Sequence, residues 1–128
     1  MSMNYTVREV KDVTILDLSG RISLGEAQAF GSDSAMVLHE LVQDFVNKGS
    51  RKILLNLRQV TYIDSSGLGE LVSCMTTLQS QGGQLRVCNP VDHVRDLLRM
   101  THLDSVLQFD KDEATSLQAL AQKKASAA

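Results

Sequence analysis

The apolar residues of this chain change their spacing several times along its 128 residues. Residues 5–10 and 13–18 alternate between apolar and polar side chains, which predicts two strands joined by a turn at Lys11-Asp12. From Ala35 to Val46 the apolar residues instead recur three and four positions apart, as on one face of a helix. A chain that passes repeatedly between these two spacings predicts an α/β protein.

Strand and helix patterns continue to alternate in the rest of the chain. Arg51 to Leu57 is almost continuously apolar, which indicates a strand covered on both faces. Gly49 and Gly82-Gly83 are stop signals for the helices that precede them. The later segments predict a helix at 66–81, a strand at 84–89, a helix at 91–100, a strand at 106–109 and a helix at 112–122.

The order β-β-α-β-α-β-α-β-α predicts a mixed β-sheet of about five strands with about four helices packed on it. Its strands should be parallel across each helical crossover and antiparallel in the opening hairpin, with the first strands at an edge. Residues 20–33, rich in Gly, Ser and Ala, are expected to form an unusually long connection. We expect a single domain over 1–128, with its core at about 5–120 and a loose tail at 123–128.

Composition and charge exclude several classes of function. The net charge is −2 and no dense basic patch is present, which argues against nucleic acid as a partner. No apolar run reaches the roughly 18 residues of a membrane span. Cys74 and Cys88 suggest neither a disulfide framework nor a metal site, so a reducing cytoplasmic location is expected. Without a P-loop or a ligand cluster, neither ATP nor a metal should bind tightly.

The stretch "YIDSSG" places an acid and two hydroxyls where a strand ends and a helix begins. In parallel-sheet folds functional groups gather at such junctions. Asp64, Ser65 and Ser66 are all candidate caps for the unpaired amides of the first helical turn. A cap, a nucleophile, a phosphate acceptor and a docking surface therefore all remain open at this position.

The helix that follows has one face of small and polar residues, formed by Ser66, Gly69, Glu70, Ser73 and Thr77. Glycines in the first turns of a helix cost on the order of 1 kcal/mol each relative to alanine. A smooth face beside exposed hydroxyls would let a partner's backbone approach closely. Small residues that simply face solvent explain the same pattern.

Two enzyme-like alternatives lack necessary parts. A receiver domain needs an acidic pair after its first strand to hold Mg²⁺, whereas the first strands here lead into Ser19-Gly20. A serine hydrolase needs a base and an oxyanion hole around its nucleophile, and no GxSxG elbow is present. His39, His93 and His102 have no spacing that points to Ser65, and we interpret them as surface or helix-terminal residues.

Three stretches together resemble the STAS domain, in particular the bacterial anti-sigma factor antagonists: "LNLRQVTYIDSSGLGELV", the "GGQL" turn and "VCNPVDHVRDLLRMTHLDSVLQF". The resemblance covers roughly residues 5–120 and implies the STAS fold. It also implies that Ser65, the serine after Asp64, is phosphorylated by an anti-sigma factor with a histidine-kinase-type ATPase fold. A PP2C-type phosphatase would reset the switch, and the chain itself would be a non-enzymatic regulator of transcription.

The resemblance also implies which residues meet the partner. The expected contact residues are Ser23, Asp64, Ser66, Gly67, Leu68, Gly69, Glu70 and Ser73. The family pattern places an acid where this chain has Ser23, although Glu26 could take its place. This departure favours an alternative, a constitutive STAS adaptor in a signalling or transporter-associated assembly. A small enzyme with Ser65 as nucleophile is the remote alternative.

Overall fold

A computed structural model describes residues 3–23 and 34–123 of the chain. Within these ranges the strands and helices follow the expected order. Their bounds are β1 Asn4–Val10, β2 Val13–Ile22, α1 Ser34–Asn47, β3 Lys52–Ile63, α2 Ser65–Ser80, β4 Gln84–Cys88, α3 Asp92–Met100, β5 Gln108–Asp110 and α4 Glu113–Lys123, with a short 3-10 helix, η2, at Leu103–Ser105. No helix in the described ranges is long and apolar enough to cross a bilayer.

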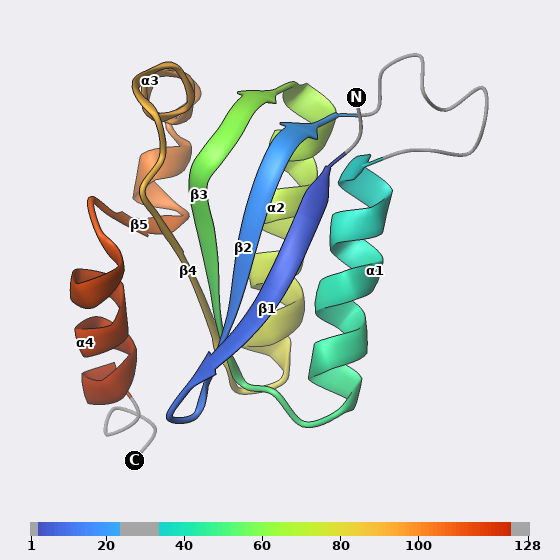
Figure 1. The fold of residues 1–128 in the computed structure, drawn as a ribbon, viewed down its shortest axis with the longest axis vertical. Helices are drawn as coiled ribbons and strands as arrows, with labels where there is room; N and C mark the ends of the chain where they lie inside the picture. Colours follow the sequence, from blue (N-terminus) through green and yellow to red (C-terminus); the bar gives the residue numbers. More distant parts are fainter. Residues whose placement is uncertain (1–2, 24–33, 124–128) are drawn as a thin grey trace.

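The five strands form one mixed sheet in the order β1-β2-β3-β4-β5 (Figure 1). β1 pairs with β2 in an antiparallel hairpin, whose turn at Lys11-Asp12 was predicted from the sequence. The pairs β2–β3, β3–β4 and β4–β5 are parallel. Because parallel strands run in the same direction, the ends of β2, β3, β4 and β5 lie along one edge of the sheet. This edge is called the carboxyl edge below.

Helices α1 and α2 cover one face of the sheet, and α4 covers part of the other (Figure 1). Strand β3 shows why both layers are needed. Its residues Ile53, Leu55 and Leu57 belong to the large core cluster that includes residues of α1, α2 and α3, whereas Leu54 belongs to a second cluster with Leu120 of α4. The prediction of a strand covered on both faces is confirmed.

Strand β2 is longer than its apolar pattern predicts. The alternation ends at Leu18, but pairing with β3 continues to Ile22, so the long connection does not begin at Gly20. The register shifts between Asp17 and Ser19 and again between Gly20 and Arg21. Each shift adds one residue on β3, and beyond the shifts β2 remains paired to Ile22 although its side chains no longer alternate regularly. The rest of the expected connection, residues 24–33 with Glu26, lies outside the described residues.

The ends of α1 and α2 agree with the glycine signals. Gly49 has φ +105° and Gly82 has φ +79°, a left-handed backbone that glycine adopts without steric cost. The amide of Gly83 donates to the carbonyl of Leu78, which closes the end of α2. The last predicted strand is displaced, because Val106 follows η2 in a helical conformation and β5 begins only at Gln108.

Candidate functional site

The paired ends of β2 and β3 bring the predicted site residues together at the carboxyl edge. Ile22 pairs with Ile63, so the residues that follow them, Ser23 and Asp64, leave the sheet side by side. The backbone amide of Asp64 lies 3.4 Å from the carbonyl oxygen of Ile22. The start of α2 is therefore anchored to the end of a strand more than forty residues earlier in the chain.

Asp64 is the N-cap of α2. It has an extended backbone, and its Oδ1 accepts a 2.9 Å hydrogen bond from the amide of Gly67. A carboxylate in this position satisfies an otherwise unpaired amide and lies at the positive end of the helix dipole. Among the three candidate caps, this geometry selects Asp64 and leaves both serine hydroxyls for other roles.

Ser65 is the first residue of α2 and is exposed to solvent. Its hydroxyl makes no hydrogen bond to any other residue in the described part of the chain. Ser66, the next residue, is half-buried. Of the two hydroxyls, that of Ser65 is the more accessible to a partner or a modifying enzyme.

Gly67 is required by close packing of the helix start against the sheet. A Cβ atom at Gly67 would lie 2.3 Å from the carbonyl oxygen of Ile22 and 2.8 Å from Cγ2 of Ile63. Gly69 differs, because no atom of the described residues lies within 4 Å of the corresponding Cβ position. One glycine of the motif thus has a structural explanation, and the other does not.

Only part of the predicted docking face reaches solvent. Leu68 is 6% exposed and belongs to the core, and Gly67 is buried beside it in the first turn of α2. Gly69 is exposed, while Glu70 and Ser73 are half-buried. The accessible surface of the motif is therefore formed by Ser65 and Gly69, with Ser66, Glu70 and Ser73 beside them.

His39 of α1 is a neighbour of this face that sequence reasoning missed. Its Nδ1 lies 3.0 Å from Oε1 of Glu70 and 3.4 Å from the hydroxyl of Ser73. Glu70 Oε1 is fully buried and accepts no hydrogen bond among the described residues, although His39 Nδ1 lies close to it. No pattern in the sequence links α1 to α2 at these positions, because the contact depends on how the two helices pack.

Comparison with known proteins establishes the family. Residues 4–116 match the model of the STAS domain. The chain belongs to the STAS domain family. The resemblance inferred from the sequence is confirmed, and the α/β sheet described above is its STAS fold.

Relatives and solved structures agree with this membership. A Thermotoga neapolitana protein with the provisional name of anti-sigma factor antagonist is 32% identical over 105 residues, 82% of this STAS chain and 87% of the relative. The anti-sigma F factor antagonist of Paenibacillus polymyxa is 25% identical over 117 residues, 91% of this chain and 94% of the relative. A solved structure of a Thermotoga maritima protein, also provisionally an anti-sigma factor antagonist, has a TM-score of 0.80 at 28% identity and covers 92% of this chain and 95% of its own.

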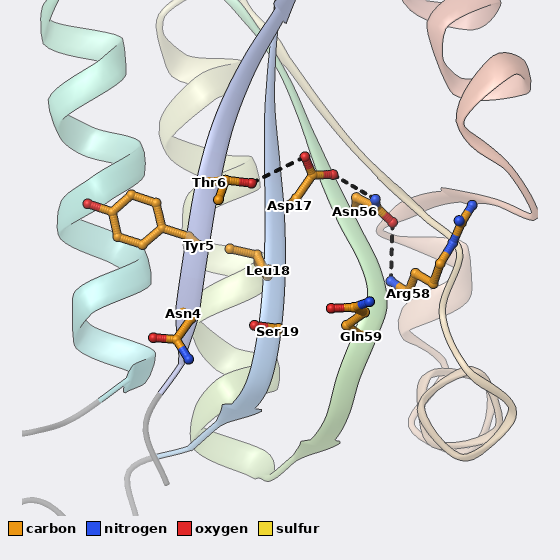
Figure 2. Close-up of a pocket in the computed structure, with 9 residues that line it drawn as sticks. All are labelled: Asn4, Tyr5, Thr6, Asp17, Leu18, Ser19, Asn56, Arg58 and Gln59. Carbon is orange, nitrogen blue, oxygen red and sulfur yellow. Dashed lines mark hydrogen bonds between the residues drawn. The ribbon is translucent and has the colours of Figure 1, made fainter.

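A polar recess of about 280 Å³ is lined by residues of three strands of the STAS sheet, β1, β2 and β3. Figure 2 shows Thr6, Asp17 and Asn56 in a row across these strands. Asn56 donates to Asp17 at 2.7 Å and accepts from the amide of Arg58 at 3.1 Å. Because Arg8 also donates to both oxygens of Asp17, these polar groups are largely satisfied by one another.

The two cysteines of the STAS domain are buried and free. Burial raises the pKa of Cys74 to about 12, with a further contribution from the charge of Glu70. Burial also raises the pKa of Cys88 to about 12, together with nearby carboxylates. Thiols with such pKa values remain protonated and unreactive at neutral pH.

Proposed function

We propose that this STAS protein is an anti-sigma factor antagonist controlled by phosphorylation of Ser65. In the unmodified state it binds an anti-sigma factor, and phosphorylation of Ser65 releases it from that partner. The observation that carries the proposal is the exposed Ser65 hydroxyl, which makes no hydrogen bond to another described residue while Asp64 caps the helix. The names of the bacterial relatives support one part of this proposal, the role of anti-sigma factor antagonist.

The position of Ser65 suits a switch that acts at an interface. A phosphate group adds a charge of roughly −1.5 to −2 at pH 7. A helix N-terminus tolerates such an anion, so the isolated domain keeps its fold. Asp64 and Glu70 nearby increase the local negative charge. A partner that covers this surface must then bury an anion, which is costly unless the anion is paired.

The partner that suits this switch is an anti-sigma factor with a histidine-kinase-type ATPase fold that acts as a serine kinase. A PP2C-type phosphatase would restore the unmodified state. The STAS protein itself acts by binding and performs no catalysis. Its contact surface is formed by Ser23, Asp64, Ser66, Gly67, Leu68, Gly69, Glu70 and Ser73, with Gly67 and Leu68 supporting the surface from the core.

A pull-down from native lysate tests the proposal with wild type, Ser65→Ala and Ser65→Asp as baits. Wild type and Ser65→Ala should retain an ATPase of the histidine-kinase-like fold, and Ser65→Asp should lose it. The retained ATPase, incubated with ATP and wild-type protein, should add one phosphoryl group that peptide mass spectrometry places on Ser65. Thr76→Ala removes an exposed hydroxyl of α2 outside the proposed contact surface; as the matched control it should still retain the ATPase and be phosphorylated on Ser65.

One observation favours a second function, that of a constitutive adaptor. Ser23 stands beside Asp64 at the carboxyl edge, where the family pattern has an acid. An adaptor would recover the same partners with all three baits and would gain no phosphate from them. That outcome would exclude control by phosphorylation of Ser65, and the surface would then be interpreted as a constitutive binding site.

A further inference from the structure

A second cavity, of about 290 Å³, lies at the carboxyl edge near the ends of β4 and β5. It is formed by α3 on one side and by the end of β5 on the other. Its lining residues are Pro90, Arg95, Arg99, Phe109, Asp110 and Lys111. This set is called the arginine pocket below, and none of its members belongs to the Ser65 site.

Three cations converge on the arginine pocket from two separate segments of the chain. Arg95 and Arg99 are four residues apart on α3, so their side chains lie on the same face of that helix. Lys111 follows β5 on the opposite side. Within the described ranges, neither Arg99 nor Lys111 forms a salt bridge. Among the described residues Arg95 forms a salt bridge only with the exposed Asp92, and an exposed ion pair of this kind contributes little stability.

The carboxylate in the pocket does not offset these charges. Asp110 accepts hydrogen bonds from Arg86 at 2.9 and 3.1 Å and from the hydroxyl of Ser116 at 2.6 Å. The side chains of Arg86 and Asp110 are only 13% and 12% exposed, so this pair forms a neutral, satisfied floor. The unsatisfied hydrogen-bonding capacity of the pocket therefore consists of cationic donors.

Another cavity with several cations shows the contrast. It lies beside the start of β3 and includes Arg51 and Lys52. Lys52 pairs with Asp12 at 3.0 Å, and Arg51 donates to the carbonyls of Val46 and Ser50. Lys52 and Arg51 thus make a salt bridge and hydrogen bonds within the fold, whereas the side chains of Arg99 and Lys111 make neither among the described residues.

We propose that the arginine pocket binds a small phosphate-type oxyanion, either inorganic phosphate or the phosphate group of a small organic monoester. Guanidinium groups bind such oxygens through paired, charge-assisted hydrogen bonds, and a lysine adds a third cation. Phe109 and Pro90 form an apolar wall against which an organic group can pack. A cavity of this size suits a small molecule, whereas an acidic protein segment needs an extended groove. The site does not depend on phosphorylation of Ser65.

Titration of ¹⁵N-labelled full-length protein at low salt tests the proposal, with inorganic phosphate and phenyl phosphate as separate probes. Saturable shifts are expected for the amide signals of Arg99, Phe109 and Lys111 with at least one probe. Tighter binding of phenyl phosphate would identify an organic monoester as the ligand class, and equal binding would identify free phosphate. Added NaCl should weaken binding by either probe, because it screens the charges.

Two variants test whether the pocket residues are responsible for phosphate binding. Arg99→Gln and Lys111→Gln should each weaken binding roughly tenfold, the effect of about 1.4 kcal/mol. Both side chains are exposed, so thermal stability should change little. Lys48→Gln removes an exposed cation at the opposite edge of the sheet and should bind like wild type.

Three outcomes would overturn the proposal. The first is the absence of saturable shifts at the pocket with both probes. The second is wild-type affinity in Arg99→Gln and Lys111→Gln. The third is that a glutamate-rich peptide produces the shifts while both phosphate probes fail, which would assign the surface to an acidic protein segment instead.

Discussion

Gly67 and Gly69 occupy the same helix two residues apart, yet they should respond differently to alanine. Gly67→Ala should lower the free energy of unfolding by about 1–3 kcal/mol, because its Cβ would overlap the Ile22 carbonyl. Gly69→Ala meets open space and should raise it by about 0.5–1 kcal/mol. Urea denaturation measures both. Equal losses in the two variants would contradict this account of the motif.

Asp64 and Ser66 are a second informative pair at the residue scale. Asp64→Ala removes the acceptor for the Gly67 amide and should lower the free energy of unfolding by about 0.5–2 kcal/mol. Asp64→Ser retains a capping oxygen and should recover most of this loss. Ser66→Ala serves as the control, and thermal denaturation should show little change. If Ser66→Ala were the more damaging substitution, the cap would be assigned wrongly.

The buried cysteines make a prediction about reactivity. Burial raises the pKa of both Cys74 and Cys88 to about 12, so almost no thiolate exists at pH 8. Iodoacetamide should leave both residues unmodified in the native protein and alkylate both in denaturant. Intact-protein mass spectrometry reads the result directly. Rapid alkylation of the native protein would show that one thiol is accessible.

At the scale of elements, two arginine–aspartate pairs connect the sheet to α4. Arg8 of β1 bonds to Asp17 of β2 and to Glu113 of α4. In the second pair, Asp110 of β5 joins Arg86 of β4 to Ser116 of α4. Among the described residues α4 is the only helix on the sheet face opposite α1 and α2. These contacts should therefore determine how firmly α4 is attached to the sheet.

These pairs predict how stability depends on pH. Hydrogen bonds from Arg8, helped by Asn56, hold the pKa of Asp17 below its usual range. Burial acts to raise the pKa of Asp110, but bonds from Arg86 and Ser116 outweigh it and lower the pKa. A carboxyl with a lowered folded-state pKa stabilises the fold fully above its unfolded pKa of about 3.9 and loses this contribution as the pH falls further.

Urea midpoints measured from pH 7 to pH 2 should therefore stay nearly constant down to about pH 5 and fall below about pH 4. Asp110→Asn should be less stable at pH 7, because Arg86 loses its ionic partner. It should also lose less stability on acidification than wild type. An equal slope in Asp110→Asn would show that Asp110 does not contribute to acid sensitivity.

At the scale of the whole molecule, the proposed switch requires that the fold survive a new negative charge. Ser65→Asp should have a free energy of unfolding within about 1 kcal/mol of wild type, because the helix dipole offsets repulsion from Asp64. Its ¹H–¹⁵N spectrum should change only around the start of α2. Widespread spectral changes would indicate that the charge acts through the fold and would contradict an interface switch.

The sequence alone determined the element order, the mixed sheet and the motif at the start of α2, because periodicity, glycine signals and capping residues are local properties. The ends of α1 and α2 follow from Gly49 and Gly82 for the same reason. The last residues of β2 escaped prediction, since pairing with the irregular β3 holds Gly20 and Ile22 in the sheet without an alternating pattern.

Only the tertiary structure decided which residues meet. It assigned the cap to Asp64, explained Gly67 through the carbonyl of Ile22, and brought His39 to Glu70. The arginine pocket likewise joins α3 to the end of β5. Each of these contacts depends on the packing of elements distant in the chain, and local spacing carries no information about such packing.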